Sequence, residues 1–225
     1  MFALFNNIIY LLFYITICNL FQIKYLLSNL INPKKKLVDI KENSLIKKIN
    51  NKTGLKIIIK IMCEEEKMIG FMVSSPPFKP MMIFSKKLYE NFNSDELEWV
   101  MLHESAHYLM WHNLKFALVQ IIYLIISLWL VFEFKISFII SIVLFVISSI
   151  LYVHTVRIFE YQADYYAATH MDNPKGMITG NIKMRKANTM LDGNNWKHLF
   201  TIGVPYEERI KMAEKQLQLN KNKVI

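Results

Sequence analysis

Residues 94–107 read SDELEWVMLHESAH, and the rest of the chain can be organised around this stretch. Ser94 suits the N-cap position of a helix, because its side-chain oxygen can accept a hydrogen bond from a free backbone N–H. Asp95 and Glu96 follow in the first turn, where the helix dipole favours acidic side chains. The sequence therefore predicts a helix that starts near Asp95 and continues through the end of the stretch.

The end of this predicted helix, residues 103–107, reads HESAH and matches the pattern H-E-x-x-H. On a helix, His103 and His107 lie one turn apart on the same face, so that both imidazoles could bind one metal ion. Glu104 would lie beside them. The pattern is short enough to occur by chance, and its interpretation therefore depends on a third ligand elsewhere in the chain.

A catalytic zinc site with two histidines needs a third protein ligand and one open position. The best candidate is Glu160, within residues 157–164, which read RIFEYQAD. Asp164 falls one turn further along the same helix face, where it could accept a hydrogen bond from a liganding imidazole and fix its tautomer. A solvent-exposed acidic face is the alternative explanation for this pair.

Two apolar runs separate these motifs. Residues 116–132 and 136–153 contain no charged side chain, and only a short turn lies between them. Each run is close to the roughly 20 residues with which a helix crosses a bilayer. The sequence predicts a transmembrane hairpin over residues 114–153, with a pair of buried soluble helices as the alternative. A hairpin returns the chain to the side it left, which would allow His107 and Glu160 to meet.

Residues 1–23 also lack charge, and they predict a transmembrane anchor within residues 1–31. A signal peptide is the alternative, but no basic residue precedes the run and no small-residue cleavage site follows it. The basic residues 34–36 come next, so the positive-inside rule predicts an N-terminus outside and a site on the cytoplasmic side of the cell membrane. The predicted organisation is an anchor (1–31), a β-rich segment with the H-E-x-x-H helix (32–113), the hairpin (114–153) and a helical cytoplasmic segment (154–225).

The composition of the 225 residues agrees with this division. Hydrophobic residues make up 53%, which excludes disorder, and 27 basic against 18 acidic residues give a net charge of +9. No basic stripe interleaved with aromatic residues is present, so nucleic-acid binding is not expected. Two cysteines exclude a disulfide scaffold. The expected fold class is a mainly helical α+β integral membrane protein, with a small sheet from strands near residues 55–62, 68–73 and 80–84; the oligomeric state is left open.

The remaining four histidines have ordinary interpretations. On a continuous helix, His112 lies about 180° round from His103 and points away from a metal there. His154 lies at the predicted membrane edge, and His170 lies off the face that carries the third ligand. His198 falls in a C-terminal loop that could return to the site, although a core or surface position is the simpler expectation.

Taken together, the motifs resemble the HtpX group of membrane zinc metallopeptidases, which is related to the type I CAAX prenyl proteases. The resemblance extends from Met68 to Ile210. It rests on the following segments: the strand with Ile69-Gly70-Phe71, residues 95–97 leading into 103–107 with a further His112, residues 160–164 after the hairpin, and Pro205 with residues 208–210. It implies that the strand around Gly70 and Phe71 pairs with an extended substrate backbone.

The resemblance implies a gluzincin with a zincin-like core. One Zn²⁺ would be held by His103, His107 and Glu160, and Glu104 would act as the general base that activates water. The implied activity is that of a metalloendopeptidase that hydrolyses peptide bonds in membrane proteins or misfolded polypeptides, as in quality control.

The chain departs from the family pattern near its C-terminus. Gly203 stands where members often carry a histidine before the final helix, an auxiliary group for the oxyanion. Tyr206, His198 and Arg209 are candidates to replace it. The departure keeps two alternatives open, a weak or inactive metal-binding membrane adaptor and a CAAX-type processing protease. A third alternative, a protease with its motif inside a membrane span, is disfavoured by the charged residues around the motif.

Overall fold

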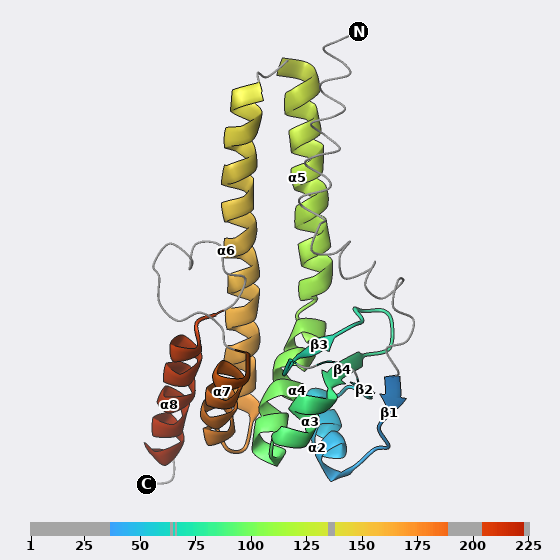
Figure 1. The fold of residues 1–225 in the computed structure, drawn as a ribbon, viewed down its shortest axis with the longest axis vertical. Coiled ribbons are helices and arrows are strands. Elements are labelled where there is room, and N and C mark those ends of the chain that lie inside the picture. The colour runs from blue at the N-terminus through green and yellow to red at the C-terminus, as the bar shows by residue number, and fades with distance from the viewer. Residues whose placement is uncertain (1–36, 64, 66, 135–137, 189–203, 223–225) are drawn as a thin grey trace. The chain divides into compact units, whose positions relative to one another are not determined.

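The computed structural model describes residues 37–63, 65, 67–134, 138–188 and 204–222 (Figure 1). The described elements are β1 (Leu37–Asp39), α2 (Ser44–Thr53), β2 (Ile58–Met62), β3 (Gly70–Met72), β4 (Met81–Ser85), α3 (Lys86–Asn91), α4 (Ser94–Leu109), α5 (His112–Phe134), α6 (Phe138–His170), α7 (Lys175–Asn188) and α8 (Tyr206–Asn222). They fall into two compact units: residues 37–113 with 156–222, and residues 114–155. The first unit contains the H-E-x-x-H helix and the third-ligand motif.

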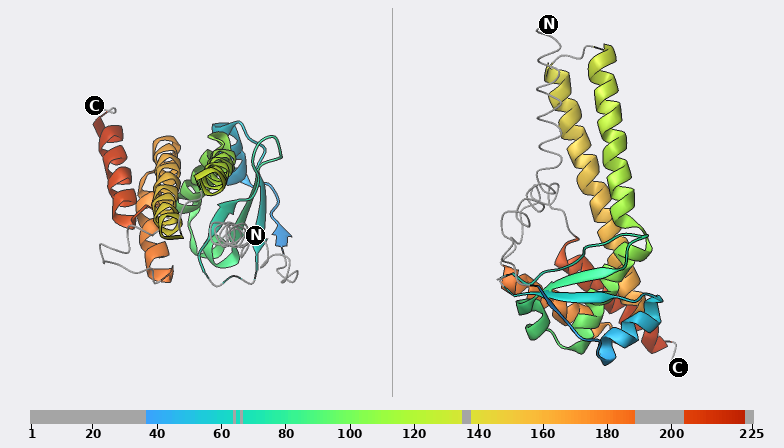
Figure 2. Two further views of the ribbon diagram at one scale, coloured as in Figure 1. Left: turned by 90° about the horizontal axis from the view of Figure 1, so that it is seen from above. Right: turned by 90° about the vertical axis from the view of Figure 1, so that its right-hand side faces the viewer.

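The first unit holds a four-stranded sheet with the order β1-β2-β4-β3. β2 and β4 are parallel, and each pairs on its other side with an antiparallel neighbour, β1 or β3 respectively. The left view of Figure 2 shows β1 at one border of the sheet, and β3 forms the other. The three expected strands are present: β2 and β3 are shorter than predicted, and β4 has the predicted length but begins one residue later. Because β3 pairs with one strand only, its second edge is left without a strand partner among the described residues.

Helix α4 is the centre of this unit and is buried along most of its length. Its N-cap is Asn93 rather than Ser94: the Asn93 side chain accepts from the Glu96 N–H, and the Glu96 side chain accepts from the Asn93 N–H. Asn and Ser are almost equally good N-caps, and the Glu three residues later completes a capping box at Asn93. The helix therefore begins one residue earlier than the sequence predicted.

Two buried carboxylates tie α4 to its neighbours. Glu98, whose side chain is 1% exposed, lies 2.6 Å from Lys48 Nζ and 2.7 Å from Lys52 Nζ, both on α2. Glu96, equally buried, lies 2.7 Å from Lys183 Nζ on α7. A buried carboxylate requires such partners, because an unpaired charge away from water is very unfavourable. The ion pairs therefore fix α2 and α7 against the helix that carries both histidines.

Helix α7 packs tightly on α4 because two of its residues lack side chains at the contact. A Cβ added to Gly176 would lie 2.5 Å from the backbone of Asp95, and one added to Gly180 would lie 2.8 Å from the Trp99 ring. Such distances are too short for carbon atoms, so both positions require glycine for this approach. In turn α8 packs on α7, which lies between α8 and α4 (Figure 1).

The helix that carries the H-E-x-x-H motif is interrupted between α4 and α5. Helix α4 ends at Leu109, Trp111 adopts a left-handed backbone with φ of 60°, and α5 begins at His112. The prediction that His112 continues the same helix and points away from His103 is therefore wrong. The left-handed residue redirects the chain, and His112 is buried within the first unit with 2% exposure. In contrast, α6 is continuous from Phe138 to His170 and carries the third-ligand motif.

The second unit consists of the parts of α5 and α6 between Leu114 and Thr155. None of the helices in the described part of the chain is long and apolar enough to cross a membrane. The predicted anchor at 1–31 lies outside the described residues, as do His198 and Gly203. Helix α8 extends from Tyr206 to Asn222.

Candidate metal centre

Three side chains from α4 and α6 converge in the first unit. Nε2 of His103 and Nε2 of His107 lie 3.2 Å apart, and each lies 3.4 Å from an oxygen of Glu160. One ligand atom from each side chain can be chosen so that all three lie within 4.8 Å of one another. The helix periodicity explains the histidine pair, whereas Glu160 reaches it because α6 passes beside α4. The structure thus brings together the three ligands expected from the sequence.

The other nitrogen of each imidazole also has a partner. Nδ1 of His103 lies 2.9 Å from Oδ1 of Asp164, which is fully buried. Nδ1 of His107 lies 3.1 Å from Nδ1 of His112. Because Nδ1 is engaged on both rings, both Nε2 atoms are directed at Glu160 and at each other. Asp164 therefore lies where the sequence placed it, one turn beyond Glu160 and against a histidine of the pair.

The separations fit a tetrahedral zinc ion. With zinc–nitrogen and zinc–oxygen bonds of about 2.0–2.2 Å, two ligand atoms of a tetrahedron lie about 3.3–3.6 Å apart. The observed separations between His103, His107 and Glu160 are 3.2–3.4 Å. Two imidazoles and one carboxylate are also a ligand set that catalytic zinc sites use, with a fourth position left for water or substrate.

The electrostatics favour a cation at the same place. Burial lowers the pKa of His103, but the Asp164 and Glu160 carboxylates outweigh burial and raise it to about 10. Burial and the neighbouring His103 lower the pKa of His107 to about 3. Burial raises the pKa of Glu160, yet the two histidines and Arg209 hold it below its usual range. The two carboxylates therefore attract positive charge to the point where the ligand atoms meet.

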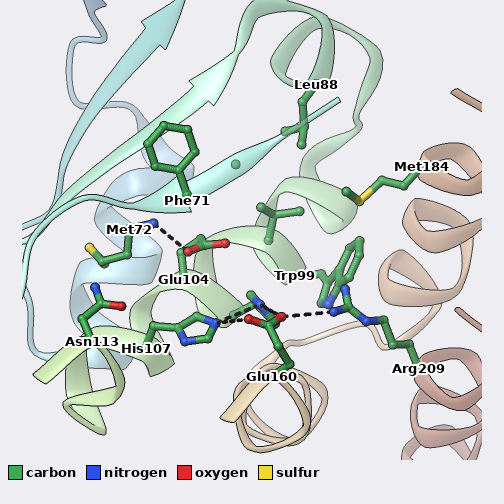
Figure 3. A pocket seen from close by; sticks show the side chains of 13 residues that line it. Phe71, Met72, Leu88, Trp99, Glu104, His107, Asn113, Glu160, Met184 and Arg209 are labelled. Carbon is green, nitrogen blue, oxygen red and sulfur yellow. Dashed lines mark hydrogen bonds and ion pairs between the residues drawn. The ribbon is translucent and has the colours of Figure 1, made fainter. Parts of the chain in front are cut away.

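Glu104 lies next to the three ligands without belonging to them. One of its carboxylate oxygens accepts a hydrogen bond of 2.7 Å from the backbone N–H of Met72, on strand β3 (Figure 3). Burial raises the pKa of Glu104 to about 7, against the opposing effect of His103. A carboxylate whose pKa is near neutrality can both accept and return a proton at physiological pH.

A pocket of about 300 Å³ opens onto this cluster. Gly70 and Phe71 of β3 line one wall, as expected for the predicted substrate strand. A Cβ at Gly70 would lie 2.6 Å from the Phe84 ring and 3.2 Å from Val100, so glycine is needed for β3 to lie this close to α4. The apolar part of the wall is formed by Leu88, Trp99, Val100 and Met184 (Figure 3).

Arg209 also lines the pocket, from the first turns of α8. Its Nη2 lies 3.2 Å from Oε2 of Glu160, and its Nε lies 2.9 Å from Oδ2 of Asp164. The guanidinium thus bridges the third ligand and the carboxylate behind His103. Of the other candidates for the auxiliary group, Tyr206 is half-buried at the start of α8, and His198 falls outside the described residues.

Sequence reasoning gave no role in the site to two residues of this cluster, His112 and Gln162. Nε2 of His112 lies 3.1 Å from Oε1 of Gln162, two residues after Glu160 on α6. On a continuous helix His112 would point away from the site, and no glycine or proline signals the break before it. The short distance in sequence from His107 was the available hint, but it does not show which way the side chain points. His154 and His170 are exposed.

Comparison with known proteins agrees with this geometry. In a search of curated proteins, no sequence is significantly similar to this one. Among solved structures, the crystal structure of S. mikatae Ste24p is similar, with a TM-score of 0.63 and 15% identity, over 94% of this chain. The chain spans only 56% of the length of that protein. The model of peptidase family M48 matches residues 61–216, which include every described candidate of the metal centre. The chain therefore belongs to peptidase family M48.

Proposed function

We propose that this protein is a zinc-dependent endopeptidase. The observation that carries the proposal is the convergence of His103, His107 and Glu160 at zinc-ligand separations beside the buried carboxylate of Glu104. Bound zinc would supply a Lewis acid that acidifies water and polarises the carbonyl of the scissile peptide bond. A metal-binding adaptor would not need Glu104, whose carboxylate faces the pocket and binds no zinc-ligand side chain directly.

In this proposal Glu104 moves the protons of the reaction. It accepts a proton from the attacking water and donates it to the nitrogen of the departing amine, as a general base and then a general acid. Its raised pKa of about 7 suits both steps. Arg209 holds Oε2 of Glu160 in place. Asp164 holds the ring of His103, which keeps its Nε2 available as a ligand.

The edge of β3 opposite β4 is the proposed binding site for the substrate backbone. β3 pairs with β4 on one side, and Gly70 and Phe71 line the pocket on the other. An extended peptide could add to this edge as a further strand, with affinity that comes mainly from main-chain hydrogen bonds. Recognition of this kind gives little sequence preference. It therefore favours general cleavage of misfolded or membrane proteins, as in the HtpX group, over processing of one particular CAAX tail.

Removal of the metal is expected to abolish cleavage. Treatment of the purified full chain with a zinc chelator should stop the hydrolysis of an unfolded protein such as casein. Added Zn²⁺ should restore it, because the proposed mechanism uses zinc as its Lewis acid. The measurement is the rate of peptide release, with the zinc content determined in parallel. Cleavage that continues after the zinc has been removed would contradict the proposal.

We further propose that the unit of residues 114–155 is embedded in the cell membrane, with the peptidase unit on the cytoplasmic side. Its support is the apolar character of the side chains that this unit exposes. Those of α5 are Leu118, Ile121, Ile122, Ile125, Ile126 and Trp129, and those of α6 are Val143, Ile147, Ile150 and Leu151. Soluble proteins rarely expose so continuous an apolar surface. Lys115 at the start of the unit and Arg157 just after its end favour the cytoplasmic placement.

Charge on the exposed face of α5 is expected to weaken membrane attachment. The parent protein should remain in the membrane pellet after alkaline carbonate extraction. The double variant Ile121→Lys, Ile125→Lys should be largely released, because a lysine in hydrocarbon is unfavourable by about 2.5–3.5 kcal/mol. Leu219→Lys on α8, an equally exposed apolar position outside the unit, is the matched control and should remain in the pellet. Release of the parent itself would contradict membrane insertion.

A further inference from the structure

The two histidines of the metal centre are supported differently. His103 has the carboxylate of Asp164 behind it, 2.9 Å from Nδ1. Behind His107 the partner is another imidazole, His112, whose Nδ1 lies 3.1 Å from the His107 Nδ1. The chain of contacts then continues from Nε2 of His112 to Oε1 of Gln162, over 3.1 Å. Nothing in the proposed cleavage reaction uses His112 or Gln162.

The direction of the hydrogen bonds follows from the use of Nε2 of His107 as a ligand. A liganding Nε2 carries no proton, so the neutral ring has its proton on Nδ1 and donates it to Nδ1 of His112. His112 then carries its own proton on Nε2 and donates it to the amide oxygen of Gln162. Each donor in this series meets an acceptor, and the reverse direction would place a proton on the ligand atom of His107. The arrangement therefore permits the tautomer that binds metal.

The fold holds His112 in this position by independent means. The left-handed backbone at Trp111 ends α4 and turns the first residue of α5 inward. The His112 ring is 2% exposed and stacks on Phe159 of α6, with ring centroids 4.6 Å apart and planes 9° apart. Gln162 comes from the same helix, two residues beyond Glu160. The pair thus connects the start of α5 to the helix that supplies the third ligand.

We propose that His112 and Gln162 are positioning residues that hold the His107 ring in the orientation and tautomer of a zinc ligand. This inference rests on the proposed zinc site and goes beyond its three ligands. Partners of the second nitrogen of a liganding histidine commonly change metal affinity by 10–100-fold when they are lost. His112 is buried and touches the ligand itself, so its loss should have the larger effect. Gln162 acts through His112, and its side chain lies closer to solvent.

Zinc affinity of the full chain in detergent tests the inference directly, by titration against a competing chelator. His112→Leu removes the acceptor while keeping an apolar side chain on Phe159, and it should weaken zinc binding by about 10–100-fold. His112→Asn keeps an acceptor near the position of Nδ1 and should recover most of the loss. Gln162→Leu should weaken binding by about 2–10-fold, the worth of one hydrogen bond. His170→Leu, a histidine on the exposed part of α6, is the control and should bind as the parent does.

A second readout separates positioning from general stability. The visible spectrum of the Co²⁺-substituted protein reports ligand geometry, and it should change in His112→Leu and return toward the parent in His112→Asn. Equal zinc affinity and equal spectra in His112→Leu and the parent would overturn the inference, as would an Asn variant no better than Leu. If His112→Leu does not fold, unchanged affinity in Gln162→Leu overturns it instead. A parent that binds zinc but cleaves nothing would overturn the proposed peptidase activity alone, and a parent that binds no zinc would overturn both.

Discussion

Replacement of Glu104 by Gln is expected to lower the rate of peptide hydrolysis by about 10²–10⁴-fold, the usual contribution of a positioned general acid–base group. Gln has nearly the same shape but cannot accept a proton from water at neutral pH. Zinc content should be unchanged, because the proposed ligands are His103, His107 and Glu160. The measurement is the rate of cleavage of an unfolded protein, with bound zinc determined on the same samples.

The fold should tolerate this replacement. The amide oxygen of Gln can still accept the hydrogen bond that the Met72 N–H donates to Glu104. Glu90→Gln is a suitable control, since Glu90 is exposed on α3 and its side chain forms a surface ion pair of 3.6 Å with Lys86. A Glu104→Gln variant that retains zinc and cleaves at the parent rate would leave the proposed mechanism without its base. Loss of zinc together with activity would instead assign Glu104 a role in binding the metal.

The placement of the three candidate ligands could be predicted from the sequence, because it depends on helical periodicity and on a simple topology. The four-residue spacing of His103 and His107 places both on one face, and the same spacing relates Glu160 to Asp164. The two apolar runs then supplied the reason why segments far apart in the sequence should meet. For this reason, the structure places Asp164 against His103 as expected.

Other parts of the site depend on features that leave no local signal. The break before His112 rests on a left-handed tryptophan, and nothing in the sequence around Trp111 marks it, since neither glycine nor proline is near. Similarly, Glu96 and Glu98 look like surface residues of a helix. Their burial becomes possible only through lysines on α2 and α7, which tertiary packing brings to them. Long-range packing of this kind cannot be inferred from periodicity.

Replacement of Asp164 by Ala is expected to destabilise the fold and the metal centre together. The carboxylate is fully buried and binds both His103 and Arg209, whose side chain is 12% exposed. Removal of one partner of a buried ion pair commonly lowers the free energy of unfolding by about 3–5 kcal/mol, because the other charge remains buried. Zinc affinity should fall by about 10–100-fold as well, since His103 loses the acceptor on its Nδ1. Thermal unfolding and chelator titration measure the two effects separately.

A double variant separates the two roles of Asp164. In Asp164→Leu, Arg209→Met the buried charge disappears along with its partner, and apolar replacement of a whole buried ion pair is often neutral for stability. The melting temperature should therefore return toward that of the parent, whereas zinc affinity should stay low because His103 still lacks its acceptor and Glu160 has lost its contact with Arg209. Asp172→Ala is the control, because the Asp172 side chain is 60% exposed and its ion pairs with Lys48 and Lys52 should contribute little. If zinc affinity recovered with stability in the double variant, Asp164 would act on the metal centre only through the fold, and the hydrogen bond to His103 would have no separate role in holding the ligand.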